Sequence, residues 1–209
     1  MIKKKEIQIQ MSKLYFRYGA MNSGKSTSLM QVAHNYEERG MKVLIVKPKV
    51  DTKGGDTLVS RLGVNRHVDL LVSEESDLFS IIHGYLQEGR KIDCILVDEV
   101  QFMKANQIDQ LFEIAVKIDI PTICYGLRTD FKREGFEGST RLLLLAHSIE
   151  EMKTICACGR KAVFNGRKLN GKFVFEGEQI AIDEQNNVEY ESLCGHCYYK
   201  YKDNLLESM

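Results

Sequence analysis

Charge of either sign is not in excess in this sequence. Lys and Arg together number 29, Asp and Glu also number 29, and the formal net charge at pH 7 is zero. Proteins that bind nucleic acid or an anionic membrane surface usually carry a basic patch or segment. The balanced charge therefore gives no support to a nucleic acid or a membrane as a partner.

Long apolar runs are also missing. The apolar run at residues 142–146, LLLLA, is far shorter than the roughly 20 residues that span a bilayer. Residues 1–11 contain lysines but lack the sustained apolar stretch of a signal peptide. Internal repeats, low-complexity segments and flexible linkers are absent too. We expect a cytoplasmic protein of ordinary globular composition, in which residues 1–12 form a solvated N-terminal tail.

The six cysteines do not indicate a disulfide framework, because the cytoplasm keeps thiols reduced. Four of them form two close pairs, Cys156 with Cys158 and Cys194 with Cys197. Four thiolates suit a closed tetrahedral zinc site, which is structural because no coordination position remains for water. Two alternatives stay open: His196 replaces one thiolate, or the cysteines remain reduced without a metal.

Short strand-like runs and helical stretches alternate over the first two thirds of the chain. The expected strands cover residues 13–18, 42–48, 91–102 and 121–127, and the expected helices cover 23–40 and 106–118. Strands without polar alternation, separated by helices, indicate a parallel sheet with helices on both faces. We therefore expect an α/β fold in which Cys94 and Cys124 are buried strand residues.

The pattern changes after His147 to cysteine pairs, short strand-like runs and loop residues. We expect a domain boundary near Glu150. Residues 13–150 would form the sheet domain, and residues 151–209 would form a small C-terminal zinc-binding domain. The 35 residues between the two cysteine pairs would be closed into a loop by the metal, whose bonds offset the entropic cost of closure. A loop held in this way can lie over a ligand.

A glycine-rich loop follows the first expected strand. Gly19, Gly24, Lys25 and Ser26 match the P-loop pattern G-x-x-x-x-G-K-[ST]. The glycines let successive N–H groups point inward at an anion, and the following helix adds its positive N-terminal end. Lys25 would reach the β- and γ-phosphates of ATP, and the Ser26 hydroxyl would ligate Mg²⁺. The alternative is a plain glycine turn before a helix. The expected ATP- and Mg²⁺-binding residues here are Gly19, Ala20, Met21, Asn22, Ser23, Gly24, Lys25, Ser26 and Thr27.

A P-loop enzyme also needs an acidic residue at the end of a neighbouring strand to position the magnesium. The segment CILVDEV provides Asp98 after four apolar residues, and Glu99 stands beside it. A carboxylate at this place can accept a proton from the attacking hydroxyl of water or of a substrate. The alternative is that Asp98 and Glu99 merely cap a strand. The expected ATP and magnesium site also includes Asp98, Glu99, Val100 and Gln101.

A series of motifs carries a family resemblance. GAMNSGKST, KPKVDT, VDEVQF, YGLRTDF, TICACGRKA, EGEQ and EYESLCGHCY occur in the order found in the zinc-containing thymidine kinases, a family shared by bacteria and animals. The resemblance runs from about Lys13 to Lys202. It implies a P-loop NTPase-type sheet plus a zinc domain with a "lasso" loop over the base. It also implies transfer of the γ-phosphate of ATP to the 5′-hydroxyl of thymidine or deoxyuridine, inhibition by thymidine triphosphate, and a homotetramer.

Single residues can be carried over where the motifs match. The resemblance implies that Glu99 is the general base, that Phe102, Phe131 and Phe136 surround the thymine ring, and that Tyr190 lies near the sugar. The lasso backbone would hydrogen-bond the base edge. Where many relatives have a Gly-Gly turn in the lasso, this chain has the longer stretch AIDEQNNVEY. The implied substrate-binding residues are Phe102, Phe131, Phe136, Gln179, Ile180, Ala181, Ile182, Asp183 and Tyr190. Asp51 and Arg61 are implied on the phosphate side, and the phenylalanines have a second interpretation as core residues.

Two other function classes compete with this interpretation. In a P-loop ATPase that acts on nucleic acid, Glu99 would activate water and the cysteine module would be a basic ribbon. Six acidic side chains accompany the five basic ones between Cys156 and Cys197, which removes most of any basic stripe. A non-catalytic nucleotide-binding protein would not need the combination of Lys25, Ser26, Asp98 and Glu99.

Overall fold

The larger part of the molecule is a six-stranded sheet in which every strand pair is parallel. The computed structural model describes residues 11–49, 57–59, 63, 65–179 and 187–207. The strands run in the order β5 (Leu70–Val72), β2 (Val43–Pro48), β6 (Cys94–Val97), β7 (Thr122–Gly126), β1 (Leu14–Tyr18) and β8 (Ser148–Glu151). Every residue of β6 and β7 is buried, because these central strands are covered on both faces. The expected parallel α/β fold is confirmed.

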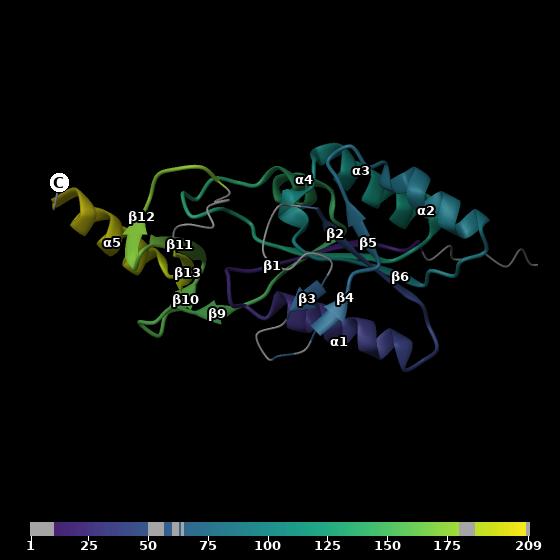
Figure 1. Ribbon diagram of the computed structural model, residues 1–209, viewed down its shortest axis with the longest axis horizontal. Coiled ribbons are helices and arrows are strands. Elements are labelled where there is room, and N and C mark those ends of the chain that lie inside the picture. Colours follow the sequence, from purple (N-terminus) through teal and green to yellow (C-terminus); the bar gives the residue numbers. More distant parts are fainter. Residues whose placement is uncertain (1–10, 50–56, 60–62, 64, 180–186, 208–209) are drawn as a thin grey trace, which may run out of the picture.

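Helices form the outer layers (Figure 1). One face carries α1 (Lys25–Glu37) and the hairpin of β3 (Thr57–Val59) and β4 (Asn65–His67). The other face carries α2 (Leu78–Gln87), α3 (Ala105–Glu113) and α4 (Glu137–Leu145). Two hydrophobic clusters match these layers: Leu29 of α1 packs on one side of the sheet, and Leu111 and Leu142 pack on the other. Among the described residues, none of the helices combines the length and the apolar character needed to cross a bilayer.

The helices and strands depart from the sequence-based expectation at their ends. The strand expected over 91–102 stops at Val97, because the backbone then turns through Glu99 into the short 3₁₀ helix η1 (Val100–Phe102). The helix expected over 106–118 changes after Glu113 into the π-helix η2 (Ile114–Ile118). The edge strands β5 and β8 are additions; they are short and carry exposed residues, so they lack a clear apolar pattern.

The smaller lobe contains the cysteine pairs. It consists of a hairpin of β9 (Thr154–Ile155) and β10 (Lys161–Ala162), an antiparallel sheet in the order β12 (Lys172–Val174), β11 (Phe164–Leu169), β13 (Val188–Leu193), and the helix α5 (Gly195–Glu207). Figure 1 shows this lobe at one end of the molecule, beyond the edge of the large sheet. It has its own hydrophobic cluster, which includes Leu193 and Tyr198. The large sheet ends at Glu151, which supports our proposal of a domain boundary near Glu150.

Candidate active site

The glycine-rich loop joins β1 to α1 at the carboxyl edge of the large sheet. The Gly19 N–H donates to the Gly126 carbonyl of β7 at 3.3 Å. A Cβ atom at Gly19 would lie 2.4 Å from Ser23 Oγ and 2.5 Å from the Met152 carbonyl oxygen, so a larger residue would clash. Asn22 and Gly24 have φ angles of 64° and 78° in the left-handed region, which is accessible to glycine and tolerated by asparagine. These conformations give the loop its curl.

Lys25 points back into the concave side of this loop. Its side chain is buried, and Nζ donates to the carbonyl oxygens of Ala20 at 3.0 Å and Gly19 at 3.3 Å. The ammonium group therefore sits among loop backbone groups at the start of α1, where the helix end also carries partial positive charge. This arrangement is suited to an anionic ligand.

Asp98 lies at the end of β6, close to the first turn of α1. The expectation that it would follow a strand next to β1 is wrong, because β7 lies between β1 and β6. The parallel strands nevertheless end at one edge, and Ser26 Oγ donates to Asp98 Oδ2 at 3.3 Å. The other oxygen, Asp98 Oδ1, is buried and has no hydrogen-bond partner among the described residues. A hydroxyl beside a buried, unpaired carboxylate oxygen is a donor set that fits Mg²⁺.

The same burial changes the protonation of Asp98. Removal from solvent, helped by the nearby charge of Glu99, raises the pKa of the Asp98 carboxyl to about 7. A bound divalent cation would counter this effect by stabilising the carboxylate. The site therefore favours either a proton or a cation at Asp98.

Glu99 is held by the residue two positions later. It is half-buried and has a φ of 50°, a left-handed conformation that is unfavourable for a residue with a side chain. Gln101 Nε2 donates to Glu99 Oε2 at 2.5 Å, and Gln101 Oε1 accepts from the Leu127 N–H at 3.1 Å. The buried Gln101 amide thus links the Glu99 carboxylate to the chain after β7. Gln101 lies at the expected site, but its observed contacts are to Glu99 and Leu127.

The three phenylalanines expected in the substrate pocket differ in how far they are buried. Phe102 is half-buried and lies edge-on to Phe136, with ring centroids 5.6 Å apart. Phe136 and Phe131 are buried, with exposed fractions of 4% and 1%. The Arg167 guanidinium lies over the Phe131 ring, 3.8 Å from its centroid. One face of Phe131 is therefore covered by a cationic side chain.

Arg167 also donates hydrogen bonds to two other implied substrate-binding residues, Gln179 and Tyr190. This buried residue of β11 donates from Nε to the Tyr190 hydroxyl at 3.2 Å and from its guanidinium to the Gln179 carbonyl at 2.9 Å. Gln179 in turn donates from Nε2 to Asp130 Oδ2 at 3.3 Å. Phe131, Gln179 and Tyr190, which are implied substrate-binding residues from distant parts of the sequence, are thus brought together around Arg167. The expected residues Ile180, Ala181, Ile182 and Asp183, and likewise Asp51 and Arg61, lie outside the described residues.

Sequence reasoning missed the contacts of Arg167 and those of Asn165 on the same strand. The Asn165 side chain accepts from the Met21 N–H at 2.8 Å and donates to the Thr129 carbonyl at 3.1 Å. The signal that could have identified Arg167 and Asn165 is their spacing of two, because residues at this spacing face the same side of a strand. Both are buried polar residues in a strand of the small lobe. Their partners could not be inferred from the spacing alone, since those partners come from distant parts of the chain.

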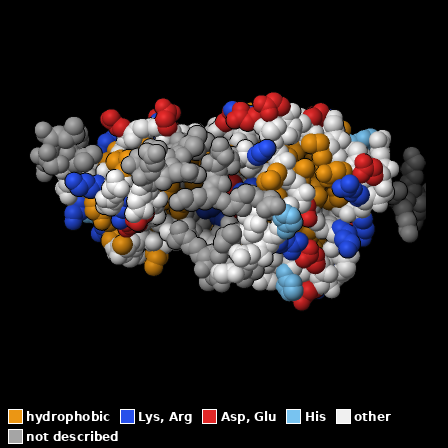
Figure 2. Space-filling model, viewed as in Figure 1, with side chains coloured by type: hydrophobic (Ala, Val, Ile, Leu, Met, Phe, Trp, Pro, Cys, Tyr) orange, Lys and Arg blue, Asp and Glu red, His pale blue; other side chains and the backbone are white. Residues whose placement is uncertain are grey.

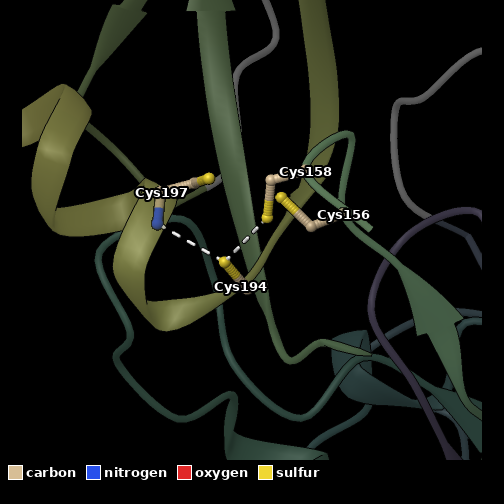
Figure 3. Close-up of side chains that lie close together, drawn as sticks. All are labelled: Cys156, Cys158, Cys194 and Cys197. Carbon is tan, nitrogen blue, oxygen red and sulfur yellow. Dashed lines mark hydrogen bonds between the residues drawn. The ribbon is translucent and has the colours of Figure 1, made fainter. Parts of the chain in front are cut away.

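The four paired cysteines converge in the small lobe (Figure 3). Their sulfur atoms all lie within 4.8 Å of one another, and Cys158 Sγ is 3.5 Å from Cys194 Sγ. Tetrahedral zinc with bonds of about 2.3 Å separates its sulfur ligands by roughly 3.8 Å, whereas a disulfide requires about 2.05 Å. The converging residues are Cys156, Cys158, Cys194 and Cys197, and the exposed His196 lies outside the group. The cluster is consistent with a structural zinc site.

Backbone polarity favours a thiolate in this cluster. The Cys197 N–H donates to Cys194 Sγ at 3.4 Å, and this bond lowers the pKa of the Cys194 thiol to about 6. The pKa of Cys197 is raised to about 12, because its thiol shares a hydrogen bond with Cys158 and is removed from solvent. The remaining two cysteines, Cys94 and Cys124, are buried in β6 and β7 as expected, and burial raises the pKa of Cys94 to about 12.

Comparison with known proteins gives a consistent result. The model of a family described as thymidine kinase matches residues 12–198. A thymidine kinase of Pasteurella multocida is 48% identical over 195 residues, covering 92% of this chain and 98% of its own. Thymidine kinases of Mannheimia succiniciproducens and Francisella tularensis are 45% and 41% identical, over 95% and 88% of this chain and 100% and 95% of theirs. Because the match extends over both lobes at this identity, the chain belongs to the thymidine kinase family.

Proposed function

We propose that this protein transfers the γ-phosphate of ATP to the 5′-hydroxyl of thymidine and of deoxyuridine. One observation carries the proposal: the small lobe packs against the carboxyl edge of the P-loop sheet, so that Arg167 contacts Phe131 of the large lobe. That edge also holds Lys25, Asp98 and Glu99. The residues implied for the donor and those implied for the acceptor therefore border a common region.

The donor side uses the P-loop. Within the expected phosphate loop Gly19–Thr27, the N–H groups of Gly19 and Met21 are already bonded to Gly126 and Asn165. The N–H groups of the loop from Asn22 onward and the Lys25 ammonium would hold the phosphates of ATP. Ser26 and the buried Asp98 would hold Mg²⁺, and the bound ion would supply positive charge beside the transferred group. Val100 lies behind these residues and is completely buried in the core, so we assign it a supporting position and no direct contact with the nucleotide.

Glu99 would act on the acceptor. Its carboxylate orients the 5′-hydroxyl and accepts the proton of that hydroxyl late in the transfer, since the transition state is loose. Gln101 restricts the carboxylate to one orientation through its bond to Leu127. The positive φ of Glu99 supports this role, because such strained conformations persist where the surrounding structure enforces them.

The acceptor pocket would be formed by both lobes. The half-buried Phe102 offers apolar surface, and the buried Phe136 packs edge-on against it. The lasso segment from Gln179 to Asp183 would hydrogen-bond the base edge through its backbone, with Tyr190 beside the sugar. Arg167 fixes the Gln179 carbonyl and the Tyr190 hydroxyl, so the described start and end of the lasso are held together. A single methyl group discriminates by only about 10–200-fold, so deoxyuridine should also be accepted.

We propose zinc as the metal of the cysteine cluster and a homotetramer as the assembly. Leu144 on α4 and Ile149 on β8 are exposed to 73% and 44%, so these apolar side chains are available to contact another copy. Light scattering at the mass of one or two chains would exclude the tetramer.

We also propose a cytoplasmic location, consistent with the free thiols, and feedback inhibition by thymidine triphosphate. Inhibition that added thymidine does not relieve would contradict binding of this triphosphate in the acceptor pocket.

A nucleic-acid-dependent ATPase is the competing function. Figure 2 shows acidic side chains along one edge and basic side chains in separate groups, so no continuous basic stripe crosses the face in view. The decisive experiment measures ADP release with Mg-ATP and a panel of acceptors: thymidine, deoxyuridine, 5′-deoxythymidine, purine deoxynucleosides and single-stranded DNA. We expect release with the first two compounds only. Release driven by single-stranded DNA, or equal release with 5′-deoxythymidine, would reject the proposal.

The raised pKa of Asp98 predicts a proton linkage. At a pH below about 7 the nucleotide-free protein holds a proton on Asp98, and Mg²⁺ must displace it. We expect Mg-ADP binding to release this proton at about pH 6.5 and not above about pH 8. Calorimetry in two buffers of different ionisation enthalpy measures the release, with Asp98→Asn as the control that lacks it. Identical proton release by the two proteins would refute the linkage.

The same shift has a consequence for stability. Because the pKa of Asp98 in the folded protein is above its ordinary value of 3.8, the folded state binds this proton more tightly than the unfolded state. The contribution of Asp98 to the nucleotide-free fold is therefore complete below about pH 4 and is lost as the pH rises through about 7. The difference in unfolding free energy between the wild type and Asp98→Asn should change in this window.

A further inference from the structure

We propose that Asn165 and Ser192 of the small lobe hold the tip of the P-loop, and that the zinc-binding domain thereby positions ATP as well as thymidine. The proposal rests on the proposed function, in which the P-loop binds ATP. It assigns these two residues as positioning residues, since they act on the nucleotide through the loop.

The contacts converge on a single residue of the loop. The Met21 N–H donates to Asn165 Oδ1 at 2.8 Å, and the Met21 carbonyl oxygen accepts from Ser192 Oγ. The next carbonyl, that of Asn22, accepts from Thr154 Oγ1 at 3.3 Å. Both backbone polar groups of Met21 are therefore bonded to side chains of the small lobe.

Asn165 and Ser192 are a cross-strand pair in the small sheet. They are directly opposite each other on the antiparallel strands β11 and β13, so their side chains emerge on the same face. Their exposed fractions are 3% and 5%, although both side chains are polar. Buried polar groups in strands are stabilised when a partner satisfies them, and here the partner is the P-loop backbone. The pair is thus placed to recognise one peptide segment.

The loop needs such a restraint. Asn22 and Gly24 both have left-handed backbone angles, and for Asn22, which carries a Cβ atom, this conformation is less favourable than a right-handed one. Strained conformations of this kind persist when the surrounding structure fixes them. Fixing the N–H and the carbonyl of Met21 limits rotation of the adjoining peptide units, so the following N–H groups keep pointing into the phosphate site.

Asn165 also connects the donor side to the acceptor side. Its Nδ2 donates to the Thr129 carbonyl at 3.1 Å, two residues before Phe131. The same side chain therefore bonds the P-loop with one end of its amide and the loop of the acceptor pocket with the other. Ser192 lies two residues before Cys194. The cysteine cluster therefore also restrains the backbone that carries Ser192 and its hydrogen bond to Met21.

Three substitutions test the proposal. Ser192→Ala removes the hydroxyl that binds the Met21 carbonyl, and Ser192→Thr keeps a hydroxyl. Asn165→Leu removes both amide contacts and keeps the branched shape of the side chain. Ser12→Ala is the matched control, because Ser12 Oγ also donates to a backbone carbonyl, that of Asp119, away from the site. Ser192→Ala removes a single oxygen atom, so it remains a test if Asn165→Leu fails to fold.

Two readouts are needed. Hydrogen exchange, measured by mass spectrometry without nucleotide, should be faster in the peptide containing Met21 and Asn22 for Ser192→Ala and Asn165→Leu, and unchanged for Ser12→Ala. The KM for ATP should rise by about two- to tenfold for Ser192→Ala, the range for one lost hydrogen bond. Ser192→Thr should restore both values.

Unchanged loop exchange in Ser192→Ala would overturn the proposal. So would an effect confined to the KM for thymidine, with the KM for ATP unaltered. If the wild-type protein bound ATP but phosphorylated no nucleoside, the proposed function would fail. The exchange readout and the affinity for ATP would still decide whether the pair holds the loop.

Discussion

Glu99→Gln is expected to lower the rate of phosphoryl transfer to thymidine by about 10²–10⁴-fold, the usual loss when a general base is removed. The amide has the shape of the carboxylate but cannot accept the proton of the 5′-hydroxyl. ATP binding should remain nearly normal, because the residues proposed for the donor side, Lys25, Ser26 and Asp98, are unchanged in this variant. Single-turnover measurement of thymidine monophosphate formation, with calorimetry for ATP affinity, separates these two quantities.

The control for this variant is Glu113→Gln. Glu113 is on α3 and pairs with Lys117, so it carries the same chemical change outside the site. The control should retain wild-type rates. A near-normal transfer rate in Glu99→Gln would remove Glu99 from the role of general base. A lost affinity for ATP would instead indicate that Glu99 acts on the donor side.

Cys194→Ser is expected to lose the bound metal and to destabilise the small lobe severely. Structural zinc sites contribute apparent binding free energies of about 10–16 kcal/mol. Three of the four cysteines, including Cys194, belong to the hydrophobic core of that lobe. We expect a rise in the KM for thymidine, because Gln179 and Tyr190, at the ends of the proposed lasso, would no longer be fixed. The KM for ATP should rise as well, because Ser192 contacts the P-loop two residues before Cys194.

Metal content and thermal unfolding test this prediction. The wild type should hold ~1 zinc ion per chain, as expected for one closed four-thiolate site. Cys94→Ala is the control, because Cys94 is buried in β6 and has no place in the cluster; it should keep its zinc. Full zinc occupancy in Cys194→Ser would contradict the ligand assignment. Zinc loss with unchanged unfolding and KM values would contradict the structural role.

The local motifs could be predicted because their chemistry depends on spacing. The P-loop residues, Asp98 and Glu99 are close in sequence to a strand end, and a parallel sheet brings such ends to one edge. The cysteine pairs likewise predicted their own cluster. The order of strands could not be predicted, so the separation of β1 from β6 by β7 was missed.

The contacts between the two lobes could not be predicted from the sequence pattern. The resemblance implied that Phe131 packs on the thymine ring, but one face of this ring is covered by Arg167 of the small lobe. Asn165 and Ser192 are ordinary polar residues in short strands, and only the folded chain shows that they bond Met21. Such pairings depend on how two separately formed sheets meet, and this information is not contained in local spacing.

The central claim is that a P-loop and one aligned carboxylate pass the terminal phosphate of ATP to a nucleoside alcohol. The most direct measurement quantifies ADP and thymidine monophosphate in the same reaction of the purified protein with Mg-ATP and thymidine. We predict equal amounts of both products, and negligible ADP when thymidine is omitted. ADP formed without thymidine monophosphate would contradict the account.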